Sequence, residues 1–231
     1  MRSRTRSPQP RRPAFYRSSS PASQYAGDDN AMTPTSPAKK SIFPLGLDSS
    51  MTLYFGLFAG SLTFDDIWRL RPQEKQYIKL YGKSCAIPRK QLSMGKDYKF
   101  SGQTAFAQPW HPQISALLQR TNQLLTSELN GCLINFYKGG EEYIGPHSDS
   151  EKGIVKGAPI VTISFGASRV FRVTRRKNVG VDHILRQDVI LCNGDCLVME
   201  GRMQQTHKHE ILKAKDVRDS RRISVTFRQF E

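Results

Sequence analysis

The chain has 231 residues, which is enough for one enzyme-sized domain and a tail. Its formal net charge of +15 comes from 35 Lys and Arg residues against 20 Asp and Glu residues. This balance favours a polyanionic partner, either nucleic acid or an acidic membrane surface, and composition alone does not choose between them. No stretch approaches the roughly 18 apolar residues of a membrane span, so no membrane-embedded segment is expected.

The four cysteines, Cys85, Cys132, Cys192 and Cys196, are scattered and form no C-x-x-C pair. We interpret them as reduced and mostly buried thiols rather than as a zinc or redox site. The N-terminus lacks the apolar core of a secretory signal, so we expect an intracellular protein.

Residues 1–45 differ in composition from the rest of the chain. They are rich in Arg, Ser and Pro and poor in apolar residues, which predicts a disordered basic tail. The first 27 residues contain no acid, as in organellar transit peptides, and SPAKKS near position 40 suits a weak nuclear signal or a phosphorylation site. Nonspecific affinity for nucleic acid explains the same composition. We expect the nucleus, with the mitochondrion or another organelle as alternatives.

The folded domain is expected to occupy residues 46–231, with regular structure beginning near Ser49. TFDDIWRL at 63–70 predicts a short helix that is capped by Thr63 and carries two acids in its first turn. A longer helix is predicted after Pro112, because Ile114, Leu117 and Leu125 recur at helical spacing. This apolar stripe indicates core packing.

From Cys132 onward the hydrophobic period changes to two. The β-rich runs are LINFY, PIVTISF, RVFRV, HILRQDVIL, DCLVME and RRISVTFR, and turn-forming residues separate them. A series of short strands without a helical period between them indicates a two-sheet barrel or jelly roll.

A candidate metal motif, His147-Ser148-Asp149, follows the Gly145-Pro146 turn. Residues i and i+2 of an extended segment point to the same side, so an imidazole and a carboxylate would project together. His207 and His209 supply a second imidazole pair further along the chain. Two histidines and one carboxylate form the facial triad that binds non-haem Fe(II). An isolated H-x-D is commonly part of a surface loop, so this spacing alone does not establish a metal site.

The segment from Arg222 to Arg228 alternates cleanly between two faces. Ile223, Val225 and Phe227 share one face, and Arg222, Ser224, Thr226 and Arg228 share the other. The polar face could lie in water on the outside of a barrel. Alternatively it lines the barrel mouth, where two arginines could hold the two carboxylates of a dicarboxylate ligand.

Several motifs resemble the AlkB family of 2-oxoglutarate dioxygenases in their order and spacing: NFYKGGEEYIGPHSDSE, PIVTISFGASRVF, GDCLVMEG, THKHEI and RRISVTFRQF. PRKQLSMG and DYKFSG at 88–102 are similar to the animal-type homologues that repair alkylated DNA and RNA. The resemblance extends from about position 77 to the C-terminus and leaves the basic tail outside.

The resemblance implies a mainly β fold with flanking helices. The expected core is a double-stranded β-helix (jelly roll) at 131–231, with N-terminal helices and a nucleotide-recognition lid at 46–130. It also implies Fe(II) as the metal, with 2-oxoglutarate and O2 as cosubstrates. His147, Asp149 and His209 would be the catalytic metal ligands, whereas His207 stands where the family often has an aromatic residue. The implied 2-oxoglutarate contacts are Asn135, Tyr137, Arg222, Thr226 and Arg228, with Arg222 at the carboxylate remote from the metal.

For the substrate, the resemblance implies that Phe100 stacks on a flipped base and that Glu151 contacts the base edge. Tyr98 and Ser101 are further candidates in the same motif region. Tyr81 would be the tip of a hydrophobic finger that enters the base stack. It replaces the larger apolar residue expected there, which leaves the preference for duplexes open. Candidate phosphate contacts are Arg89, Lys90, Arg172, Arg175, Arg176 and Lys177, although a solvated basic face would contain the same residues.

The function implied by the resemblance is oxidative demethylation of nucleic-acid bases such as 1-methyladenine and 3-methylcytosine. Formaldehyde, succinate and CO2 would be released, and the role would be repair of DNA alkylation. We expect a monomer that acts on alkylated DNA, with RNA as a second substrate class and no membrane association. The alternatives are an RNA demethylase or protein hydroxylase of the same fold, and a catalytically inactive nucleic-acid-binding module.

Overall fold

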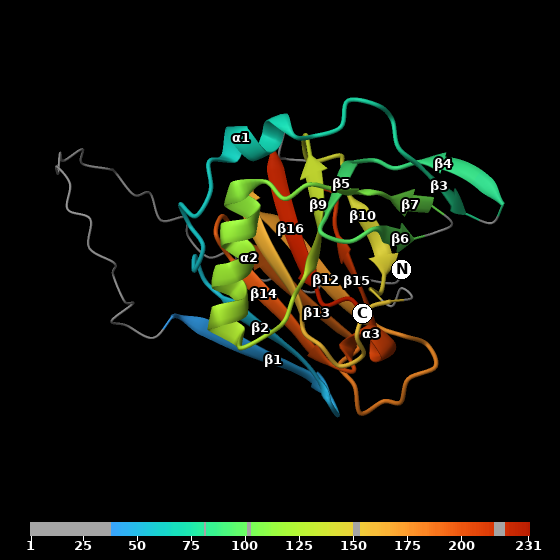
Figure 1. The fold of residues 1–231 in the computed structure, drawn as a ribbon. Helices are drawn as coiled ribbons and strands as arrows, with labels where there is room; N and C mark the ends of the chain where they lie inside the picture. The colour runs from blue at the N-terminus through green and yellow to red at the C-terminus, as the bar shows by residue number, and fades with distance from the viewer. Residues whose placement is uncertain (1–37, 81, 101–102, 150–152, 215–219) are drawn as a thin grey trace, which may run out of the picture. The chain divides into compact units, whose positions relative to one another are not determined.

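The computed structural model describes residues 38–231, except for 81, 101–102, 150–152 and 215–219. The predictions for residues 1–37 therefore lie outside the described part of the chain. Two β-sheets form the centre of the described part, and helices and short hairpins are added to them (Figure 1).

The larger sheet has eight strands in the order β1-β2-β14-β11-β16-β9-β5-β8. All neighbouring strands are antiparallel apart from β5 and β8. Their bounds in this order are Lys40–Gly46, Ser49–Tyr54, Cys196–Gly201, Ile160–Gly166, Arg222–Arg228, Gly131–Tyr137, Lys90–Met94 and Ala107–Gln108.

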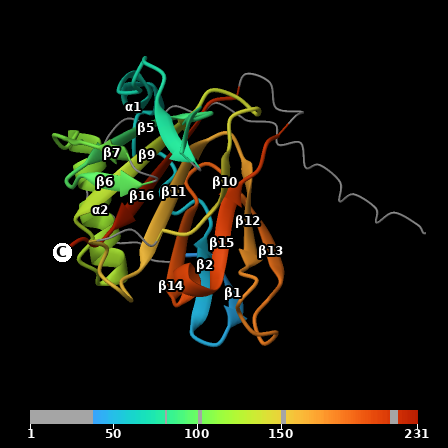
Figure 2. The ribbon, with the colours of Figure 1, turned by 90° about the vertical axis from the view of Figure 1, so that its right-hand side faces the viewer.

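The smaller sheet has the order β10-β15-β12-β13, and it lies on one side of the larger sheet (Figure 2). Its strands span Ile144–His147, His207–Ile211, Arg169–Arg175 and Arg186–Leu191. One hydrophobic core contains side chains of both sheets, such as Leu53 and Ile160 from the larger sheet and Phe171 and Val173 from the smaller. The predicted jelly-roll class is confirmed, because alternating side chains of both sheets meet in one core.

A second core lies between the larger sheet and the helices α1 (Phe64–Arg69) and α2 (Pro112–Leu125). Ile67 and Ile114 belong to the same buried cluster as Val225 of β16. Both helices begin where the sequence predicts, although the Thr63 side chain forms no capping hydrogen bond. A third, short helix, α3, spans Met203–Thr206. Among the described residues, no helix combines the length and apolar character needed to cross a membrane.

Two short hairpins precede α2 in the chain (Figure 1). The first pairs β3 (Tyr77–Leu80) with β4 (Lys83–Ala86), and the second pairs β6 (Tyr98–Phe100) with β7 (Gln103–Ala105). Side chains of both hairpins line the cavity described below. This is the region in which the sequence predicts a nucleotide-recognition lid.

The structure corrects two expectations about the first half of the chain. Residues 40–46 form strand β1, so regular structure begins before the predicted boundary at residues 45 and 46. β2, β5 and β8 also join the larger sheet, so residues 46–130 contribute more than helices and a lid. In β2 the inward residues do not alternate with the outward ones, so this strand carries no period-two signal in the sequence.

Candidate active site

Three side chains that can bind a metal converge where β10 meets β15. His147 ends β10 and lies directly opposite His209 of β15 in the strand pairing, and Asp149 follows two residues later. The distances from Asp149 Oδ1 are 3.4 Å to His147 Nε2 and 3.9 Å to His209 Nε2. The three ligand atoms all lie within 4.8 Å of one another. The two separations from Asp149 Oδ1 are compatible with ligands that bind one metal ion at about 2.0–2.2 Å each.

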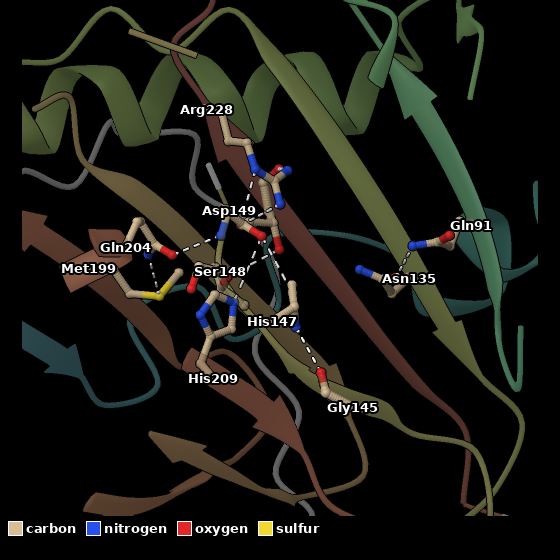
Figure 3. Close-up of polar contacts among 12 residues, drawn as sticks. Gln91, Asn135, Gly145, His147, Ser148, Asp149, Met199, Gln204, His209 and Arg228 are labelled. Carbon is tan, nitrogen blue, oxygen red and sulfur yellow. Dashed lines mark hydrogen bonds and ion pairs between the residues drawn. The ribbon is translucent and has the colours of Figure 1, made fainter. Parts of the chain in front are cut away.

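Neighbouring groups orient these ligands (Figure 3). His147 Nδ1 lies 3.0 Å from the Gly145 carbonyl oxygen, and donation there leaves Nε2 available to a metal. The backbone amide of Asp149 donates to Gln204 Oε1 at 2.9 Å. Phe171 stacks on the His209 ring at a centroid distance of 5.3 Å. The site is thus held by groups outside the triad itself.

The protonation states also suit metal binding. Burial and the neighbouring His147 lower the pKa of His209 to about 3, so its ring is neutral. Burial raises the pKa of Asp149, but the Arg228 guanidinium and the His147 ring outweigh it and hold the pKa well below its usual range. Asp149 Oδ1 is buried and accepts no hydrogen bond from the described residues. The neutral His209 ring and the ionised Asp149, whose Oδ1 faces both histidine rings, are what a cation requires.

Arg228, at the end of β16, binds the metal-motif carboxylate (Figure 3). Its Nη2 and Nε donate to Asp149 Oδ2 at 2.6 and 3.1 Å, which leaves Oδ1 for the metal. The guanidinium also lies 4.6 Å from the centroid of the Tyr98 ring. Arg228 therefore neutralises and orients Asp149.

Arg222, at the start of β16, is completely buried. Its Nη2 donates to Ser164 Oγ at 2.8 Å, and the guanidinium lies 5.1 Å from the centroid of the Tyr137 ring. Its Nε and Nη1 have no hydrogen-bond partner among the described residues. A buried guanidinium with two unsatisfied donors fits a carboxylate ligand.

One cavity of about 580 Å³ connects the two parts of the site. Every predicted metal and 2-oxoglutarate residue lines it, namely Asn135, Tyr137, His147, Asp149, His209, Arg222, Thr226 and Arg228. This volume is typical of a small-ligand pocket. The polar face of β16 therefore lies in the cavity and not in water, while Ile223, Val225 and Phe227 pack into the core beneath the helices.

Of the predicted base contacts, the structure describes one side chain. Tyr98 is buried and lines the cavity. Tyr81, Ser101 and Glu151 lie outside the described residues, as does the side chain of Phe100. Their roles stay predictions.

His207 is separate from the metal cluster, as the sequence analysis expects. Its ring is buried, with Nε2 lying 3.0 Å from the Ile184 carbonyl oxygen and Nδ1 lying 2.8 Å from Thr206 Oγ1. Both ring nitrogens are thus engaged in the protein interior, which leaves His209 as the ligand from this strand.

The prediction that Arg89 contacts phosphate is wrong for this structure. The residue is 8% exposed, lines the cavity and donates from Nε to Asn135 Oδ1 at 2.8 Å. Arg172, another of the predicted phosphate contacts, forms two hydrogen bonds with the Asp188 carboxylate. Sequence position alone did not reveal that Arg89 points inward just before β5.

Arg169 is a residue that the sequence analysis did not single out. It is 2% exposed, and its guanidinium donates to the backbone carbonyls of Gly139, Gly140, Glu142 and Leu212. It thereby fastens the loop between β9 and β10, which joins Tyr137 to the metal motif. No local sequence pattern marks this role, because the partners of Arg169 are backbone carbonyls of distant residues.

We expect Arg169→Met to lower the free energy of unfolding by about 3 kcal/mol, because it leaves several buried carbonyls unpaired. Denaturant unfolding measures the loss. Arg172→Met, on the same strand, is the matched control, and an exposed ion pair of its kind contributes at most about 1 kcal/mol. Equal losses in the two variants would contradict a fastening role for Arg169.

The comparisons with known proteins match this geometry. Residues 65–228 match the family model of the 2OG-Fe(II) oxygenase superfamily. The chain belongs to this superfamily. It is 31% identical over 206 residues to the human DNA oxidative demethylase ALKBH2, a match covering 84% of this chain and 77% of the relative. It is 29% identical over 136 residues to the human alpha-ketoglutarate-dependent dioxygenase alkB homolog 3, covering 57% of this chain and 47% of that protein.

A solved structure of OsALKBH1 shares the fold, with a TM-score of 0.56 and 18% sequence identity. The similarity covers 83% of this chain and all of that one. The resemblance to the AlkB family is therefore confirmed, and this AlkB-family chain is an Fe(II)- and 2-oxoglutarate-dependent dioxygenase. Its metal is Fe(II), and its cosubstrates are 2-oxoglutarate and O2.

Proposed function

We propose that the chain is an oxidative demethylase of nucleic-acid bases, with 1-methyladenine and 3-methylcytosine as representative substrates and formaldehyde, succinate and CO2 as products. The observation that supports it most is the joining of the His-Asp-His cluster and the buried Arg222 in one cavity, with two hairpins at its edge. The naming of human ALKBH2 as a DNA oxidative demethylase supports nucleic acid as the substrate class. The net charge of +15 agrees with this.

In this proposal His147, Asp149 and His209 hold the iron. The bound iron and 2-oxoglutarate supply the oxidation of the alkyl group. Arg228 keeps Asp149 ionised and turned toward the metal, and Arg222 receives a carboxylate of 2-oxoglutarate through its unsatisfied donors. Tyr98 helps to exclude water from the cavity. The chain's own residues therefore bind, orient and screen the reactants.

The cavity also determines how a base reaches the metal. Ile78, Cys85 and Ala86 of the β3–β4 hairpin line it, and so does Tyr98 of β6. A base in a duplex cannot enter a cavity of this kind unless it leaves the stack. We propose that the hairpins form the nucleotide-recognition lid.

The direct test is demethylation of matched single- and double-stranded DNA and RNA that carry 1-methyladenine or 3-methylcytosine. Succinate release with and without each methylated oligonucleotide shows whether the substrate stimulates turnover. We expect release of formaldehyde and restoration of the base on at least one DNA substrate. Activity on RNA alone would favour the RNA demethylase, and 2-oxoglutarate turnover that no oligonucleotide stimulates would favour the protein hydroxylase.

Tyr81 stands in the sequence between β3 and β4, at the proposed finger position. A wedge is useful only when a base must leave a stack, which costs a few kcal/mol. We therefore expect Tyr81→Ala to lose several-fold activity on a methylated duplex and to retain nearly all activity on the matching single strand. Initial rates on the two substrates measure the difference.

Phe100→Ala is the comparison, because stacking in the pocket is needed however the base arrives. It should lose activity on both polymers. Equal losses on both polymers in Tyr81→Ala would mean that Tyr81 only packs against its neighbours. A wild type that already ignores duplexes would place the enzyme with single-strand demethylases.

A further inference from the structure

The amide of Asn135 has its oxygen held from two sides. Asn135 lies on β9 and is paired in register with Gln91 of β5. Its Oδ1 accepts hydrogen bonds from Arg89 Nε at 2.8 Å and from Gln91 Nε2 at 3.0 Å, and the second contact is drawn in Figure 3. All three side chains are buried, and all three line the cavity.

These contacts determine the orientation of the Asn135 amide, that is, where its oxygen and its NH2 group lie. A guanidinium has donors and no acceptor, so the atom of Asn135 that faces Arg89 must be the oxygen. The NH2 group of the same amide then lies on the side away from Arg89. A flipped amide would bring two donors together beside Arg89. It would also present an acceptor in place of the NH2 group, and an acceptor repels a carboxylate.

We propose that Arg89 and Gln91 are positioning residues that hold the Asn135 amide with its NH2 group toward a carboxylate of 2-oxoglutarate. The proposal rests on the proposed assignment of this cavity as the cosubstrate site. It gives the PRKQ segment a role inside the enzyme, at the cosubstrate, in place of the phosphate contact expected for Arg89.

The same residues connect the cosubstrate site to the base of the β3–β4 hairpin. Gln76 precedes β3, and its side-chain amide forms two hydrogen bonds with the backbone of Gln91, at 2.7 and 2.8 Å. The Gln76 carbonyl accepts a hydrogen bond from the amide of Ile87, just after β4. Both ends of the hairpin are therefore tied to the residue that supports Asn135. The hairpin base and the cosubstrate amide form one continuous hydrogen-bonded unit.

The first test measures 2-oxoglutarate affinity by titration calorimetry, with Mn(II) in place of Fe(II) so that no turnover occurs. We expect Arg89→Met to weaken binding about tenfold, the effect of one well-placed hydrogen bond to a charged ligand. In an Asn135→Ala background the same change should have almost no further effect, because Arg89 acts through Asn135. Independent, multiplicative losses in the double variant would overturn the proposal. Lys90→Met is the control, since its Nζ contacts the Gln73 and Glu74 carbonyls instead.

The second test uses Asn135→Asp, which separates the two ends of the amide. The new carboxylate still accepts hydrogen bonds from Arg89 and Gln91, so the melting temperature should not fall. It presents an oxygen in place of the NH2 group, so 2-oxoglutarate should bind more weakly than to Asn135→Ala. Wild-type affinity in Asn135→Asp would contradict the inference. If Arg222→Met loses affinity and the Asn135 variants do not, only this inference fails. If none of them loses affinity, the proposed cosubstrate site itself is wrong.

Discussion

Replacing His209 by alanine is expected to abolish turnover while leaving the fold largely intact. The ring is one of three protein ligands that converge on a single point, and it is neutral because burial lowers its pKa to about 3. Loss of a residue that merely supports a metal ligand typically costs about 10–100-fold in affinity or activity, so loss of the ligand itself should exceed that. We expect both iron binding and succinate release to fall by more than about a hundredfold.

Metal binding by calorimetry and succinate release together measure this effect. The matched control is His207→Ala on the same strand, since its ring contacts the Ile184 carbonyl and Thr206 rather than the cluster. This control should lose about 1–3 kcal/mol of stability through its unpaired partners and still bind iron. Full activity in His209→Ala with iron bound would show that the ligand is misassigned.

The Asp149 variant should differ from the two histidine variants in its effect on the fold. Asp149→Ala removes the partner of Arg228, whose guanidinium is 2% exposed and donates twice to Oδ2. A buried charge without its partner is strongly destabilising. His147 lies at the more exposed edge of the cluster, so His147→Ala should lose activity with less damage to the fold.

The parts of the site that sequence reasoning identified depend on local periodicity. In β16 the alternation from Arg222 to Arg228 places apolar residues in the core and polar residues in the cavity, as predicted. The i, i+2 spacing of His147 and Asp149 likewise brings both side chains toward one point. Such patterns survive folding because neighbouring residues on a strand keep their relative directions.

The parts that sequence reasoning missed depend on distant partners. Arg169 binds the carbonyls of Gly139, Gly140, Glu142 and Leu212, and no local pattern marks a backbone carbonyl as a partner. Arg89 looks like a surface cation in the sequence, yet its partner Asn135 is 46 residues away. The strands β1 and β5 likewise owe their position to pairing with β2 and β9. Tertiary context decides all of these; the sequence analysis gave Arg169 no role and gave Arg89 the wrong one.

Replacing Arg222 by methionine is expected to raise the 2-oxoglutarate requirement steeply and to change the maximal rate little. A hydrogen bond to a charged group contributes about 1.5–3 kcal/mol, which corresponds to a loss of roughly tenfold to more than a hundredfold in affinity. Arg222 has two buried donors, Nε and Nη1, without a partner among the described residues. Methionine fills a similar volume and needs no hydrogen bond, so the variant should fold.

The measurement is succinate release against 2-oxoglutarate concentration, together with calorimetric affinity in the presence of Mn(II). The preceding residue provides the control, since Arg221 is exposed and pairs with Asp65 at 2.8 Å, and Arg221→Met should leave the requirement unchanged. Arg228→Met should behave differently again, because its guanidinium holds Asp149 and its loss should weaken metal binding as well. An unchanged 2-oxoglutarate dependence in Arg222→Met would mean that the free donors of Arg222 do not bind the cosubstrate. Since Arg222 is completely buried, its two donors would then need another partner inside the cavity.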